Sequence, residues 1–166
     1  NLFKNILISF IHFILSIPFS YFNLINYSKI EYKAYLQPPG YVFGIAWSII
    51  YLLFGIINLN VIYSNSLVNS LKINIINQSV IEALIQTLWL IVNVNYFWKK
   101  KYIQEIFGFV IIFILVYYAY FVRLPLLKSI NSNIYLLYIP YCIWILFALV
   151  LSYQLVFTPV KIKNHT

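Results

Sequence analysis

The sequence predicts an all-α membrane protein, a five-transmembrane-helix bundle that forms a single domain over residues 1–166. Of its 166 residues, 63% are apolar and only 8% are charged, whereas a soluble globular chain carries about a quarter charged residues. Apolar stretches long enough to cross a hydrocarbon core of about 30 Å recur along the whole chain. The protein is therefore expected to be an integral, multi-pass membrane protein in contact with lipid.

Five spans are predicted, all of them helical because irregular backbone is not tolerated in contact with lipid. Their expected limits are Leu2–Phe22, Val42–Tyr63, Val80–Trp98, Ile106–Leu126 and Ile134–Phe157. Gln86, Asn93 and Asn95 make the third span the most polar, and these side chains are expected to face the bundle interior, where they find partners. The segment Ser64–Ser79, rich in Asn and Ser, is expected to be a mobile loop, and a short interfacial helix within it is the alternative.

The first span has an alternative interpretation as a signal peptide. Lys4 precedes an apolar stretch, and small residues occur near Ser20. The apolar part of a signal peptide is usually only about 7–15 residues long. This stretch is longer, which favours a retained span.

The formal charge of +8 is expected to reflect membrane topology, and no nucleic-acid partner is predicted. The basic residues lie almost entirely between or beside the apolar stretches, as in contact with lipid headgroups. Seven lie in the first loop, the third loop and the tail, against four on the other side, which are Lys4, Lys72, Arg123 and Lys128. The positive-inside tendency therefore places the C-terminus in the cytoplasm.

The titratable residues do not form a recognisable hydrolase or metal site, and no cofactor is expected to be required. Glu31, Glu82 and Glu105 are expected in loops or at span ends. His12 lies inside the first span, where an ionisable residue is a functional candidate. Interhelical hydrogen bonding is the favoured role for His12, and axial ligation of haem is the alternative. The single cysteine, Cys142, excludes a disulfide within the chain.

The second span begins with a marked pattern, QPPGYVFGIAWSIIYLLFG. Its two prolines suit the start of a helix rather than its interior. Small residues at Gly40, Gly44 and Ser48 recur every four residues, which predicts close approach of another helix at Gly44. A second row at the same spacing carries aromatic side chains, namely Phe43, Trp47 and Tyr51.

The fifth span repeats this arrangement in YIPYCIWILFALVLSYQ. Tyr141, Trp144 and Ala148 follow a three-to-four spacing, and Trp144 lies deep in an apolar helix. Two indoles with nearby tyrosine hydroxyls and amides suit a flat apolar ligand that has a polar edge. Ordinary core packing is the competing interpretation for these aromatic residues.

Both patterns resemble the translocator protein / tryptophan-rich sensory protein (TspO/MBR) family. The family's second-span signature is matched by Pro38, Pro39, Val42, Phe43, Gly44, Trp47, Tyr51 and Gly55. Its fifth-span pattern is matched by Pro140, Tyr141, Trp144, Phe147, Ala148 and Leu151. The third-span motif is not recognisable, although Asn93 or Asn95 can supply its polarity and Trp89 or Trp98 its aromatic ring.

The resemblance implies a membrane-embedded binding protein for tetrapyrroles (protoporphyrin IX and haem), and for sterols or other flat apolar ligands, which acts in their transport, sensing or turnover. Members are often dimeric. Implied ligand-binding residues are Pro39, Phe43, Trp47, Tyr51, Asn93, Tyr141, Trp144 and Ala148. Some bacterial members degrade protoporphyrin in light, so Trp47 and Trp144 are also candidates for catalysis. Two alternative functions therefore stay open, a photo-oxidative porphyrin-degrading enzyme and a membrane scaffold. The implied membrane is the mitochondrial outer membrane in a eukaryote, and otherwise the plasma membrane or another internal membrane.

Overall fold

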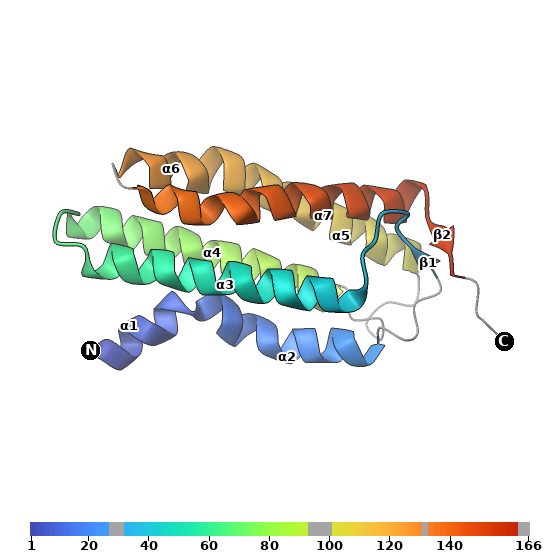
Figure 1. Ribbon diagram of the computed structural model, residues 1–166, viewed down its shortest axis with the longest axis horizontal. Coiled ribbons are helices and arrows are strands. Elements are labelled where there is room, and N and C mark those ends of the chain that lie inside the picture. The colour runs from blue at the N-terminus through green and yellow to red at the C-terminus, as the bar shows by residue number, and fades with distance from the viewer. Residues whose placement is uncertain (27–31, 93–100, 131–132, 163–166) are drawn as a thin grey trace.

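The computed structural model describes residues 1–26, 32–92, 101–130 and 133–162. Most of these segments are helical, and the long helices run roughly along one common axis, whereas the first two helices are bent relative to each other (Figure 1). In chain order the helices are α1 (Leu2–Ser9), α2 (Ile11–Asn26), α3 (Gly40–Tyr63), α4 (Asn69–Val92), α5 (Lys101–Tyr118), the π-helix η3 (Ala119–Arg123), α6 (Leu124–Ser129), the 3₁₀ helix η4 (Asn133–Tyr138) and α7 (Ile139–Phe157). The predicted all-α class is confirmed.

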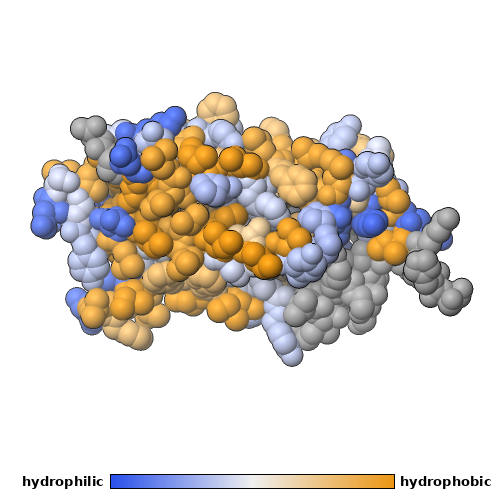
Figure 2. All heavy atoms as spheres, viewed as in Figure 1, coloured by the Kyte–Doolittle hydropathy of each residue, from blue (hydrophilic) through white to orange (hydrophobic). Residues whose placement is uncertain are grey.

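Four of the described segments are long and apolar enough to cross a membrane, namely Gly40–Tyr63, Asn69–Val92, Tyr102–Ser129 and Asn133–Phe157. A fifth span exists if the bent pair α1 and α2 counts as one, since residues 2–21 pass the same test with a 53° bend. The bend lies at Phe10, which ends α1. Figure 2 shows apolar residues predominating between the two ends of the bundle, while the most hydrophilic residues gather near the ends.

The prediction for the third span was wrong at its N-terminal end. The helix α4 begins at Asn69 rather than at Val80, so only residues 64–68 connect it to α3. The polar residues of this stretch suggested a loop, but Asn74 and Asn77 are exposed side chains of a helix whose opposite face is buried at Ile75 and Ser79. The predicted end of the span, at residues 93–98, lies outside the described residues.

The helices pack in layers that fix which side chains meet in the core (Figure 1). Helix α4 contacts α2, α3 and α5, while α7 packs against α5 and α3, and η4 packs against α3. The first loop and the tail meet in a two-stranded antiparallel sheet formed by β1 (Tyr32–Lys33) and β2 (Val160–Lys161). Both segments therefore lie at the same end of the bundle.

The prediction that Gly44 packs against a neighbouring helix was wrong. Gly44 is exposed, and a Cβ atom added there would meet no atom within 4 Å. The close approach occurs at Gly55, three turns further along α3, where the ring of Phe10 lies against the backbone. The row Gly40, Gly44 and Ser48 therefore does not serve as a packing groove within the described chain.

Candidate functional site

The indoles of Trp47 and Trp144 meet in the interior although 97 positions separate them in the chain. Their ring centroids lie 6.4 Å apart with the planes at 88°, an edge-to-face contact between α3 and α7. The ring centroid of Trp89, on α4, lies 6.5 Å from that of Trp47. Three helices thus contribute one indole each, and all three side chains are half-buried.

Three further residues complete what we call the aromatic cluster, defined as Phe43, Trp47, Tyr51, Trp89, Tyr141 and Trp144. Phe43 packs edge-on against Trp144 at 5.8 Å. The ring centroids of Tyr51 and Tyr141 lie 5.5 Å and 6.3 Å from that of Trp47. Both tyrosines are buried, at 6% and 1% exposure. The cluster therefore has a buried side lined by tyrosines and a more exposed side lined by indoles and Phe43.

The spacing of the sequence explains this convergence. On α3, Phe43, Trp47 and Tyr51 recur every four residues and so share one helix face. On α7, Tyr141 and Trp144 are three apart, and Ala148, 8% exposed, follows one turn later on the same face. The span that contains Trp144 begins with η4 at Asn133, which agrees with the expected start near Ile134 and brings Trp144 to the depth of Trp47.

Of the other predicted site residues, Pro39 lies apart from this cluster. Pro39 is the exposed N-cap of α3, one turn before Phe43. Asn93 lies outside the described residues. The role of each in ligand binding stays a prediction.

Hydrogen-bonding groups lie in the aromatic cluster and beside it, where Gln86 neighbours Tyr141. The indole Nε1 of Trp144, the hydroxyl of Tyr141 and both amide atoms of Gln86 are buried and have no hydrogen-bond partner among the described residues. Gln86 is 3% exposed, which confirms that it faces the bundle interior. An apolar ring ligand with hydrogen-bonding groups at one edge would find partners on this side.

Comparison with known proteins decides the family of the chain. The model of the TspO/MBR family matches residues 7–157. This protein belongs to the TspO/MBR family. No curated protein matches the sequence significantly. The two segments that carry the resemblance, at the start of α3 and in α7, supply Trp47 and Trp144 to the aromatic cluster of this TspO/MBR protein.

A second group of interior residues was missed by the sequence analysis. Glu82 was expected at a span end, yet it is fully buried in the middle of α4. Arg123 was counted among the four basic residues on the side opposite the cytoplasm, yet it is also fully buried. Neither belongs to the motifs by which the chain resembles the TspO/MBR family.

The ionisable group around Glu82 takes side chains from four elements. Tyr138 of η4 donates a hydrogen bond to Glu82 Oε2. His12 Nε2 of α2 lies 3.7 Å from Glu82 Oε1, and Arg123 Nε of η3 lies 3.8 Å from the same oxygen. Among the described residues His12 has no hydrogen bond at either ring nitrogen, so the favoured interhelical hydrogen bond of His12 is not formed.

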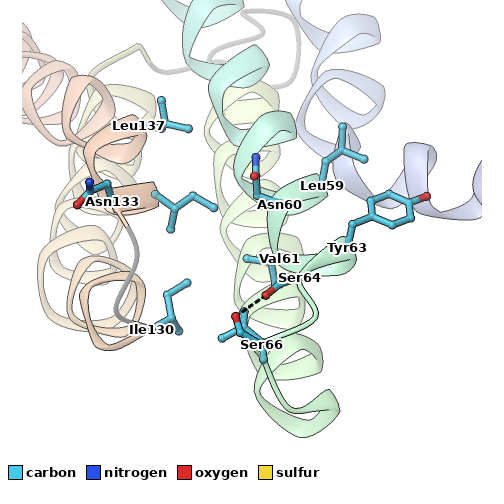
Figure 3. Close-up of a pocket in the computed structure, with 11 residues that line it drawn as sticks. Leu59, Asn60, Val61, Tyr63, Ser64, Ser66, Ile130, Asn133 and Leu137 are labelled. Carbon is cyan, nitrogen blue, oxygen red and sulfur yellow. Dashed lines mark hydrogen bonds between the residues drawn. The ribbon is translucent and has the colours of Figure 1, made fainter.

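A groove of about 780 Å³ lies near the C-terminal end of α3. Figure 3 shows it between Asn60 and Ser64 on one side and Ile130, Asn133 and Leu137 on the other. Leu59, the first α3 residue of its lining, is twelve residues beyond Trp47, about 18 Å along the helix. Within the described part of the chain, none of the predicted site residues lines the groove, and its lining has no charged side chain. The aromatic cluster is the better candidate for a specific site because indoles, hydroxyls and an amide converge there.

Proposed function

We propose that this TspO/MBR protein binds tetrapyrroles such as protoporphyrin IX and haem inside its helical bundle, and acts in their transport, sensing or turnover. The observation that carries the proposal is the convergence of Trp47, Trp89 and Trp144 from three helices. Flat aromatic ligands gain from stacking on indole faces. Small-molecule sites also combine an apolar lining with a few polar groups that fix orientation.

The arrangement of the cluster defines how such a ligand would enter. Trp47 and Trp144 contact each other directly, so a ring ligand has to separate them. Both indoles are only half-buried, so the outer side of the cluster is the side from which a ligand would enter, whereas the buried Tyr51 and Tyr141 close the inner side. The polar edge of the ligand would then meet the Tyr141 hydroxyl and the Gln86 amide.

Sterols rank second as ligands. The sterol pattern attributed to animal relatives requires a basic residue within about one to five positions of a tyrosine. Here Tyr153 is followed by seven residues before Lys161. We therefore place tetrapyrroles ahead of sterols in the proposal.

A second candidate function is light-dependent oxidation of bound porphyrin. The edge contact of Trp47 with Trp144 favours it, because two electron-rich indoles would lie beside the same excited ring. Such an enzyme would consume light and dioxygen, and the loss of the porphyrin spectrum would follow illumination. A scaffold role, in contrast, predicts partner binding without any ligand.

The test is a titration of the purified protein in detergent with protoporphyrin IX, followed by tryptophan fluorescence. Saturable quenching in the micromolar range supports the proposal, and its absence refutes it. Trp144→Phe should weaken binding. Tyr117→Phe, which alters an exposed aromatic residue of α5, is the matched control and should leave binding unchanged. Parallel samples in light and darkness distinguish degradation from binding. Degradation by the protein predicts that the porphyrin spectrum is lost in the illuminated sample and kept in the dark sample, whereas binding alone predicts no such difference.

A further inference from the structure

Two stripes of buried polar side chains face each other where the N-terminal segment packs against α4. We call them the polar seam, and no member is more than 4% exposed. One stripe recurs at intervals of three and four residues and consists of Ser9, His12 and Ser16; the other has the same spacing and consists of Ser79, Glu82 and Gln86. Helices α2 and α4 are in direct contact. The seam therefore runs through the interior of a bundle whose outer surface is apolar.

The centre of the seam carries opposite charges that are withdrawn from solvent. The side chains of His12, Glu82 and Arg123 have no exposed surface. Ionisable residues inside membrane helices are costly, and they mark sites of ion or proton chemistry. Arg123 balances the charge of Glu82, so the pair is neutral and His12 is the group left over.

The hydrogen bonds at this centre leave several buried polar atoms without a partner among the described residues. Tyr138 donates to Glu82 Oε2, and Arg123 Nη1 donates to the carbonyl of Ile75 at 2.9 Å. Glu82 Oε1, both nitrogens of His12, and Nε and Nη2 of Arg123 have no hydrogen-bond partner among the described residues. The 3.7 Å between Oε1 and His12 Nε2 is too long for a hydrogen bond. A carboxylate oxygen thus faces an imidazole nitrogen across a short gap.

Arg123 enters the interior through an irregular turn. It ends the π-helix Ala119–Arg123, which directly precedes α6. Pro125 follows and cannot donate a backbone hydrogen bond to the carbonyl of Phe121. Single π-turns inside α-helices occur frequently at functional sites. This turn is a second feature of the chain that converges on Glu82.

We propose that His12 and Glu82 form a proton-binding site inside the bundle. A proton taken up from the bulk phase bonds between His12 Nε2 and Glu82 Oε1, and no covalent bond between heavy atoms changes. The facing pair then forms a direct N–H···O hydrogen bond, and the centre gains one positive charge. Among the described residues, the other titratable or charged groups that face His12 are Arg123 from η3 and Tyr51 from α3. The ring centroids of Tyr51 and His12 lie 5.7 Å apart. Tyr138 from η4 reaches His12 through Glu82.

The competing explanation is that the seam only holds helices together. Polar side chains often hydrogen-bond across membrane helices, and Asn58 of α3 does so here with Ser79 and with the carbonyl of Ser9. A purely structural seam would not exchange protons with the medium. Direct observation of the two side chains separates these explanations without any tetrapyrrole ligand.

The composition of the chain makes that observation simple. It contains two histidines and three acidic residues. The background variant His165→Asn, Glu31→Gln, Glu105→Gln leaves His12 and Glu82 as the only histidine and the only acidic side chain. In lipid nanodiscs, ¹⁵N NMR of the imidazole and infrared bands of the carboxyl group are recorded across the pH range in which the protein stays folded. Coupled changes in both signals, with the same midpoint, support the site.

Two variants in this background test the roles of the neighbours. Glu82→Gln should abolish the change at His12, and Arg123→Gln should increase the fraction of protonated His12 at a fixed pH because it removes the competing cation. Lys128→Gln, an exposed cation in the same segment, should change neither signal. Spectra of His12 and Glu82 that do not change with pH in the background variant overturn the proposal, and that measurement decides the matter even if Glu82→Gln or Arg123→Gln fails to fold.

Discussion

The ring of Phe10 packs directly against the backbone of Gly55. A Cβ atom added to Gly55 would stand 2.7 Å from Cζ of Phe10 and closer still to two other ring atoms. Phe10 is the residue at which α1 ends and the N-terminal segment bends. Gly55 therefore sets how closely this bent segment approaches α3.

Gly55→Ala should destabilise the protein by about 1–3 kcal/mol, because overpacking forces the Phe10 ring out of its position. Gly44→Ala is the matched control on the same helix, since nothing lies within 4 Å of its added Cβ atom. Thermal unfolding in detergent measures both. Equal melting temperatures for the two variants would contradict this account of the bend.

Tyr138→Phe should destabilise the fold by about 1–3 kcal/mol, because it leaves a buried carboxylate oxygen of Glu82 without its donor. Tyr135→Phe changes a half-buried tyrosine of the same 3₁₀ helix and should have little effect. The measurement is again thermal unfolding, at one pH and one detergent concentration. A Tyr138→Phe protein as stable as Tyr135→Phe would show that the hydrogen bond to Glu82 contributes no net stability.

Ala148→Leu should weaken protoporphyrin binding with little effect on folding, because the larger side chain occupies space beside Trp144. Ala119→Leu is the control, since Ala119 is equally small and fully buried but lies in η3. Overpacking there should lower stability and leave the affinity of the folded fraction unchanged. If Ala148→Leu lowers the melting temperature and binds porphyrin normally, the aromatic cluster is ordinary core packing.

The first loop and the tail should both face the cytoplasm. Tyr32 and Lys161 are direct partners in the small antiparallel sheet, so Tyr32→Cys with Lys161→Cys should form a disulfide when Cys142 is replaced by Ser. The pair Tyr32→Cys and Ser129→Cys should not, because Ser129 ends α6 at the other end of the bundle (Figure 1).

The cytoplasmic assignment itself requires labelling from one side. Because Arg123 is buried, it no longer counts among the four basic residues on the side opposite the cytoplasm. Lys4, Lys72 and Lys128 are left there, so the excess of basic residues on the predicted cytoplasmic side is larger. A membrane-impermeant thiol reagent should reach a cysteine at position 161 only in inside-out vesicles. Labelling of that position in right-side-out vesicles would reverse the orientation.

The sequence alone determined the class, the family and the two aromatic rows. Hydropathy is a local property of each stretch of chain, so the membrane class needed no knowledge of the contacts. The rows on α3 and α7 follow from helical spacing, which fixes the shared face of Trp47 with Tyr51 and of Tyr141 with Ala148. Helical spacing did not show that the aromatic face of α3 packs against the aromatic face of α7.

Only the tertiary structure decided which small and polar residues matter. Gly44 and Gly55 both lie in the apolar sequence of α3 and both match the family signature. What distinguishes them is the ring of Phe10, which packs against Gly55 only. Glu82 was misplaced because polar residues before it suggested a loop. In the structure those residues continue the helix α4, whose buried face carries Glu82 and whose opposite face leaves Asn74 and Asn77 exposed. Arg123 points into the interior from a π-helix that the local sequence pattern did not predict. In each case the energy of a side chain depends on what covers it, and that covering comes from segments distant in the chain.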